Sequence, residues 1–293
     1  MMRFAGALVI ALLAVGVFAP APPARAHEGL IEPYESPPPV IARTTVYTFR
    51  NGYLDPKHWR IITQPGAGRG TAQPELQYYD TDAVTVSRGV LHLSALSYDK
   101  IDPEWGFDWH YVSGRIESTD AYLYGRFDVR LKVPIGDGLW PAVWLHSVDP
   151  AAKFGGQIDI YDGFGSHTDG FTVASSKSAN GKTVAANCII VENFPSDSRC
   201  RRIGNPQRAR VNYSRDYHTF SVDWQPDHIT WYVDNKAYWT ITHDVPNVPM
   251  VLVMDLAVGG PQDGNPTGPR PFPIPYRTRF PADFEIASVA ITK

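Results

Sequence analysis

The sequence of 293 residues is poor in cysteine and methionine, with two and four of them, and carries no excess of either charge. A net charge of −3 gives no electrostatic reason to expect binding to nucleic acid or to an anionic membrane surface. Beyond the N-terminal region, no stretch longer than a few turns has a helical apolar period, which excludes a helical fold class. Neutral polymers are the partner class that this composition favours.

Residues 1–26 are typical of a signal peptide. Arg3 supplies the positive charge, residues 5–19 are almost entirely apolar, and Ala24 and Ala26 form an A-x-A cleavage signature. The apolar run is shorter than the ~20 residues that a spanning helix needs, so we expect export with cleavage before His27 rather than membrane anchoring. The mature protein would be secreted or periplasmic and free of the membrane. Residues 27–44 are rich in proline and predict an extended arm.

Residues 45–293 predict one all-β domain. Runs of β-branched and aromatic residues recur between turn signals, and two hairpins can be placed at residues 84–95 and 219–233. A composition with 12% aromatic residues and 26 prolines suits a large antiparallel sandwich.

One stretch, residues 155–163, places polar side chains on a strand that is otherwise apolar. Side chains alternate along a strand, so Gln157 and Asp159 share one face while Ile158 and Ile160 occupy the other. If an extra residue bulges the strand at Tyr161, Asp162 joins the face of Gln157 and Asp159. A half-buried strand with a solvated polar face would give the same pattern.

Three motifs in fixed order carry a family resemblance: YGRFDVRLKVP at residues 124–134, GLWPAVWL at 138–145 and GGQIDIYD at 155–162. Together with residues 75–79, 113–116, 217–226 and 229–234, they make residues 46–293 resemble glycoside hydrolase family 16. The resemblance implies a concanavalin A-like jelly roll of two antiparallel sheets. It also implies a concave cleft that takes a β-linked polysaccharide, with no cofactor, and we expect a monomer.

The third motif departs from the family pattern. The family carries Glu-x-Asp-x-Glu, or a bulged Glu-x-Asp-x-x-Glu, in which the first Glu is the nucleophile and the last is the acid/base. Here these places hold Gln157, Asp159 and Asp162. A primary amide is a very poor nucleophile, so the double-displacement route is not open to this strand.

Further residues are predicted to contact substrate. By resemblance, Trp140 and Trp144 form sugar platforms, Arg115 reaches the negative subsites, and Asp255 adds a carboxylate where relatives often have Asn. Tyr161 completes the predicted binding set. Trp105 and Trp109 are weaker candidates for cleft lining, and each of these residues could instead belong to the core or to a surface ion pair.

Cys188 and Cys200 are the only cysteines, and in an exported chain they predict a disulfide. No metal is expected. The family often has a structural calcium that uses an Asp of the final strand, and the matching place is Ala287, which offers no side-chain oxygen.

Four functions remain open. The first is a family 16 hydrolase that works by another route, such as substrate assistance by a 2-acetamido group held by Gln157. The second is a carbohydrate-binding protein without catalysis, the third is a polysaccharide lyase, and the fourth is a lectin or adhesion protein without a cleft. The lyase reading uses Gln157, Arg115 and Tyr161, although no His stands beside Gln157 in its own strand.

Overall fold

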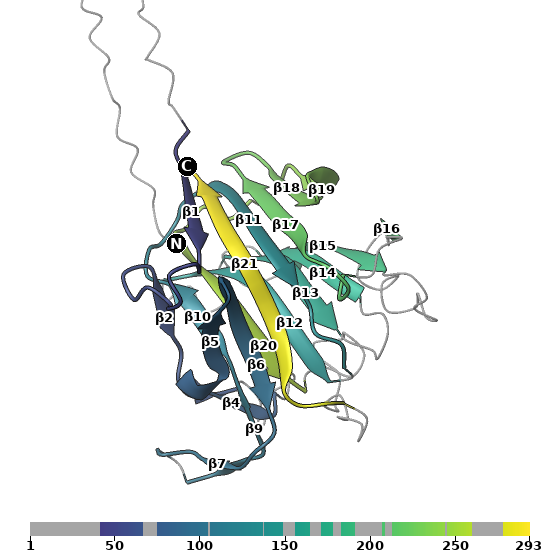
Figure 1. Cartoon of the computed structure of the whole chain (residues 1–293). Coiled ribbons are helices and arrows are strands. Elements are labelled where there is room, and N and C mark those ends of the chain that lie inside the picture. Colours follow the sequence, from purple (N-terminus) through teal and green to yellow (C-terminus); the bar gives the residue numbers. More distant parts are fainter. Residues whose placement is uncertain are drawn as a thin grey trace, which may run out of the picture. The chain divides into compact units, whose positions relative to one another are not determined.

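The computed structural model describes residues 42–66, 75–104, 106–136, 138–148, 156–164, 171–177, 183–190, 207–208, 213–243, 245–259 and 278–293. In these ranges the secondary structure is β, apart from one turn of 3-10 helix, η1 (Thr81–Ala83). Two large sheets and a small one contain all the strands (Figure 1).

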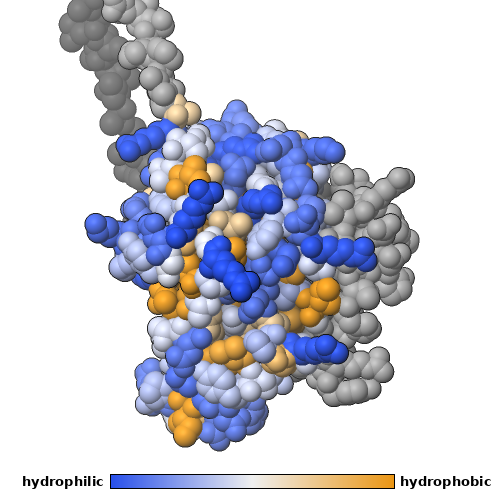
Figure 2. Space-filling view, viewed as in Figure 1, coloured by the Kyte–Doolittle hydropathy of each residue, from blue (hydrophilic) through white to orange (hydrophobic). Residues whose placement is uncertain are grey.

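The first large sheet has eleven strands. Nine of them follow one another in the order β19 (Lys236–Ile241), β18 (Ile229–Val233), β17 (His218–Trp224), β11 (Gly125–Lys132), β21 (Ala282–Thr292), β6 (Val90–Leu96), β9 (Tyr111–Ser113), β4 (Gln77–Tyr79) and β3 (Gln64–Pro65). The other two are β1 (Thr44–Thr48), which pairs with β21, and β5 (Val84–Ser87), which pairs with β6. The face of the molecule seen in Figure 1 is largely hydrophilic, with scattered apolar residues (Figure 2).

The second large sheet has eight strands, in the order β16 (Gln207–Arg208), β15 (Thr183–Ile190), β14 (Phe171–Lys177), β13 (Gln157–Phe164), β12 (Leu139–Ser147), β20 (Met250–Val258), β10 (Arg115–Ser118) and β2 (Trp59–Ile61). The small sheet pairs β7 (Lys100–Ile101) with β8 (Asp108–Trp109). Strand pairs are antiparallel except β4 with β9 and β15 with β16.

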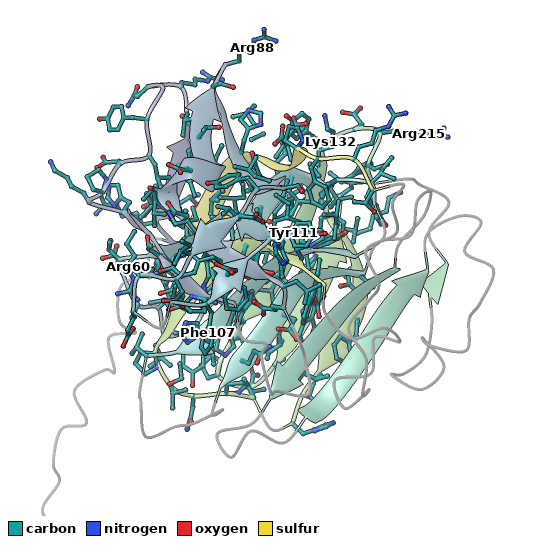
Figure 3. All side chains as sticks on the ribbon, turned by 90° about the horizontal axis from the view of Figure 1, so that it is seen from below. Arg60, Arg88, Phe107, Tyr111, Lys132 and Arg215 are labelled. Atoms are coloured by element: carbon teal, nitrogen blue, oxygen red, sulfur yellow. The ribbon has the colours of Figure 1, made fainter. Side chains whose placement is uncertain are left out.

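The core lies between the two large sheets. Along β11, alternate residues are buried, as the period of two in the sequence predicts. The largest fully buried side chains include Trp224, Trp231 and Phe127. Side chains crowd the interior between the ribbons (Figure 3). The predicted antiparallel sandwich is therefore confirmed.

Both predicted hairpins are present. Strands β5 and β6 pair across Arg88 and Gly89, whose φ angles of 51° and 78° are the positive values that a tight two-residue hairpin turn requires. Strands β17 and β18 form the second hairpin. Local turn chemistry thus fixes the register of two neighbouring pairs before any long-range contact is made.

Candidate functional site

Strand β13 carries the bulge that would bring three polar residues onto one face. Across β12, Trp144 pairs with Asp159 and Val143 pairs with Tyr161, so Ile160 is an extra residue. Ile160 and Tyr161 are both buried in the core, whereas Asp162 is half-buried and accepts a hydrogen bond from the Trp140 indole. We call the side of β10, β12, β13 and β20 that faces away from the core the site face.

The bulge also corrects one predicted contact. Tyr161 does not reach the site face: its side chain is 4% exposed, and its ring lies 4.7 Å from that of Phe220 and 6.4 Å from that of Phe284. Burial raises the pKa of its hydroxyl well above the usual value. Tyr161 is a core residue, and the prediction that it contacts substrate is wrong because the bulge turns it inward.

Gln157 and Asp159 are joined on the site face. The Gln157 Nε2 atom donates to Oδ1 of Asp159 over 2.6 Å, and Asp159 itself is 6% exposed. Across the ladder, Gln157 pairs with His146 of β12. The place that would need a carboxylate nucleophile therefore holds a neutral amide, whose N–H group is directed at its neighbour.

The two tryptophans of β12 contact carboxylates as well as offering ring faces. The Trp140 indole donates to Asp162, and the Trp144 indole donates to Asp255 over 2.8 Å. The Trp144 ring lies 5.1 Å from the ring of His146 and 5.4 Å from the Arg115 guanidinium. Both tryptophans lie on the site face, and each one fixes the carboxylate beside it.

Asp255 belongs to a buried network that sequence reasoning missed. The Tyr79 hydroxyl lies 3.2 Å from Oδ2 of Asp255 and 3.3 Å from Oε2 of Glu75, so one O–H group is placed between two carboxyl groups. Burial raises the pKa of Asp255, and the positive charge of Arg115 offsets this only in part. Burial also raises the pKa of Tyr79. No short-range pattern in the sequence links Tyr79 to Asp255, since 176 residues separate them.

Arg115 is held by an ion pair on its own strand. Its Nη2 atom lies 2.7 Å from Oε1 of Glu117, and Nη2 of Arg60 lies 2.5 Å from the other oxygen of that carboxylate. The Glu117 side chain is 6% exposed. Burial alone would raise its pKa, but the His146 imidazole 3.8 Å away, the hydrogen bond from Arg60 and the charge of Arg115 lower it well below the usual range. Arg60 lies on β2, the last strand of the sheet, and is labelled in Figure 3. Arg115 and Glu117 are two residues apart on one strand, so their side chains share a face. This spacing in the sequence could have predicted the ion pair.

Several residues singled out in the sequence lie away from the site face or outside the described residues. Cys188 lies in β15, but Cys200 is outside the described residues, as are Trp105 and residues 1–41. Trp109 is buried at the small sheet. Ala287 is the extra residue of a second bulge, in β21 opposite β11.

The described residues contain neither a cluster suited to a metal ion nor a membrane-spanning helix. Across those ranges, three His, Cys, Asp or Glu side chains nowhere gather closely enough to hold a metal ion. Over the same ranges, no helix has both the length and the apolar character needed to cross a bilayer.

The site face can bind a polyhydroxylated ligand. It combines aromatic surface with carboxylates and an amide, which accept and donate hydrogen bonds to hydroxyl groups. Retaining glycoside hydrolysis needs two carboxyl groups about 5 to 5.5 Å apart, one of them nucleophilic. With Gln157 in the first polar place, the carboxyl groups that β13 offers on the site face are those of Asp159 and Asp162.

Comparison with known proteins places the chain in a family. The model of the family "Glycosyl hydrolases family 16" matches residues 75–269. Glucan endo-1,3-beta-glucosidase A1 of Niallia circulans is 29% identical over an alignment of 274 positions, which covers 85% of this chain and 36% of that protein. The beta-1,3-glucan-binding protein of Penaeus monodon is 28% identical over an alignment of 183 positions, which covers 60% of this chain and 45% of that protein. This chain thus spans 36% of the length of the first relative and 45% of the length of the second.

Solved structures show the same fold. The catalytic domain of an endo-1,3-beta-glucanase (laminarinase) from Thermotoga petrophila superposes with a TM-score of 0.68 at 24% identity, covering 85% of this chain and 96% of that chain. The match covers the sandwich that carries the site face. With the family model matching well over half of its residues, the chain belongs to glycosyl hydrolase family 16.

Proposed function

We propose that this chain is an exported glucan-binding protein that engages a β-1,3-linked glucan on the site face and does not cleave it by double displacement. One observation carries this proposal: the Gln157 amide occupies the first polar place of β13 and donates to Asp159 over 2.6 Å. A neutral primary amide is a far poorer nucleophile toward an anomeric carbon than a carboxylate. The binding surface around it, with Trp140 and Trp144, needs no nucleophile.

The relatives support the choice of glucan. One is named a glucan endo-1,3-beta-glucosidase and another a beta-1,3-glucan-binding protein, so both names refer to a β-1,3-glucan. A glucan is neutral, and the site face suits a neutral ligand because Arg115 is already paired with Glu117. Export is supported by the sequence of residues 1–26.

The structure brings a histidine close to Gln157, as a lyase would need, but buries the tyrosine that a lyase would use as its base. His146 pairs with Gln157 across the β12–β13 ladder, which supplies the histidine that the strand itself lacks. Tyr161, the residue required as the base, is buried in the core and reaches no ligand on the site face. Arg115 is bound to Glu117 rather than presented to a uronate. We therefore do not favour this function.

The experiment uses the exported, mature protein and soluble oligomers of β-1,3-glucan, mixed-linkage β-glucan, galactan, chitin and uronate. Calorimetry reports binding, while reducing ends and the ultraviolet absorbance of unsaturated products report cleavage. We expect binding of β-1,3-glucan with no new reducing ends. Rapid cleavage that requires a 2-acetamido group would replace the proposal with substrate-assisted hydrolysis. Binding of none of the polymers would overturn it.

A further inference from the structure

A tryptophan of the opposite sheet contacts the backbone of β13 at the bulge. The indole Nε1 of Trp231, in β18, donates a buried hydrogen bond of 2.8 Å to the carbonyl oxygen of Asp159. In a regular strand, carbonyl groups point sideways to the neighbouring strands and not across the core. A donor in the eleven-stranded sheet meets this oxygen because the peptide that follows Asp159 turns toward the core at the bulge.

Both ladders of β13 contain the same irregularity. On the β12 side, pairing passes from Asp159 directly to Tyr161; on the β14 side, it passes from Asp159 to Gly163. Between the ladder pairs of Asp159 and Gly163, β14 contains one residue fewer than β13. Strand β13 therefore has one extra residue relative to β14 as well as to β12. Ladder hydrogen bonds to β14 are therefore interrupted where Trp231 makes its contact.

The bulge decides which side of the sheet Asp162 occupies. Along a regular strand, a side chain two or four residues from Ile158 lies on the same face as Ile158, which is the core. Without the extra residue, Asp162 would point into the core and Tyr161 would point outward. The observed arrangement is the reverse, with Tyr161 buried and Asp162 bound to the Trp140 indole.

The donor is held firmly in place. Trp231 is 0% exposed, and its ring stacks on that of Trp239 at 4.3 Å with an angle of 25° between the planes. Across the hairpin it pairs with Val222 of β17. A fixed indole N–H at the core side of the bulge satisfies a carbonyl group that would otherwise be buried with one fewer partner.

We propose that Trp231 is a positioning residue: its indole N–H pins the bulge of β13 and thereby holds Asp162 on the site face. Trp231 lies in the other sheet and acts through the backbone of Asp159, without touching a ligand. The consequence for glycan binding rests on the function proposed above, whereas the consequence for the bulge does not.

The chain offers a matched control. Trp224 is also 0% exposed, and its indole donates over 2.9 Å to a backbone carbonyl, that of Pro246, away from the bulge. Trp231→Phe and Trp224→Phe each keep an aromatic ring and delete one buried N–H group. Replacement of Trp231 by benzothienylalanine, which exchanges the N–H for sulfur in a ring of the same shape, serves if the Phe variant does not fold.

Two measurements test the proposal. Hydrogen–deuterium exchange of the peptide that contains residues 157–164 needs no ligand, and we expect at least tenfold faster exchange in Trp231→Phe but not in Trp224→Phe. For β-1,3-glucan, we expect at least tenfold weaker binding by Trp231→Phe only. Adding Asp162→Ala should then cost far less in Trp231→Phe than in the wild type, because both changes remove the same contact.

Equal exchange in the two Phe variants would overturn the proposal, whatever the glucan data show. Unequal exchange with no glucan binding by the wild type would support the role of Trp231 and refute the function proposed for the site face. Additive losses in the double variant would show that Trp231 does not act through Asp162.

Discussion

The Gln157 amide nitrogen and Oδ1 of Asp159 are 2.6 Å apart, which makes the amide a donor to the carboxylate beside it. In a family 16 strand that cleaves by double displacement, both places are carboxylic, and the second orients the first. Here the two places hold an amide and a carboxylate, joined by a hydrogen bond. Recognition of a glycan by the surrounding surface does not depend on that nucleophile.

Restoring the carboxylates should restore chemistry. Gln157→Glu with Asp162→Glu recreates Glu-x-Asp-x-x-Glu on the bulged strand, with both groups on the site face. We expect slow hydrolysis of β-1,3-glucan oligomers with retention at the anomeric carbon, followed by nuclear magnetic resonance. Gln157→Glu alone is the control, because it supplies a nucleophile but leaves the shorter acid. An inactive double variant that still binds glucan would show that more than these two side chains has changed.

Trp140 should contribute to glucan binding in two ways, through its ring and through the hydrogen bond to Asp162. We expect Trp140→Ala to weaken binding by about 1 to 3 kcal/mol, as for an aromatic contact at the centre of an interface. Trp140→Phe keeps a ring but deletes the donor, so its affinity should lie between those of the wild type and the Ala variant. Calorimetry measures both, with circular dichroism to verify folding. Unchanged affinity in a folded Ala variant would remove Trp140 from the site.

Glu117→Gln should destabilise the fold in a pH-dependent way. The folded-state pKa of Glu117 is lowered, so its ionised form contributes stability above the unfolded-state pKa of about 4.3, and this contribution is lost as the pH falls toward the folded-state value. We expect a loss of about 3 kcal/mol at pH 7, because the buried Glu117 charge that pairs with the largely buried Arg115 and the exposed Arg60 is removed. Urea unfolding measures the difference, which should narrow below a pH of about 4.

A surface pair provides the comparison for Glu117. Asp128→Asn removes the partner of Arg126 in the eleven-stranded sheet, where the two side chains lie 2.8 Å apart and are partly exposed. Such a pair contributes about 0 to 1 kcal/mol. Equal effects of the two substitutions at pH 7 would contradict the role given to Glu117.

The disulfide between Cys188 and Cys200 stays a prediction. In exported protein we expect both thiols to be oxidised, and a loop this short should stabilise the fold by ~3 kcal/mol in the chain-entropy model. Alkylation under denaturing conditions followed by mass spectrometry counts the thiols, and melting with and without reductant measures the stabilisation. Two alkylated cysteines in native material would refute the pairing.

The sequence alone determined the fold class, the two hairpins and the presence of a neutral amide at the first polar place of β13. Alternation of apolar residues is local, turn residues such as Arg88 and Gly89 set register over a few positions, and the chemistry of the Gln157 amide does not depend on its surroundings. These features can be predicted from short segments because side-chain alternation, turn conformation and the chemistry of a side chain each depend on only a few neighbouring residues.

Only the tertiary structure decided how the site is completed. Tyr161 points inward because β13 contains one extra residue at the bulge. The carbonyl group of Asp159 at this bulge accepts a hydrogen bond from Trp231, which is 72 residues away in the sequence. Asp255 and Tyr79 likewise meet across 176 residues, and burial raises the pKa of Asp255 although the contacts with Arg115 and Tyr79 oppose that shift. A buried carbonyl or carboxyl group takes its partners from whichever strands the sandwich brings next to it, and local sequence does not record which strands those are.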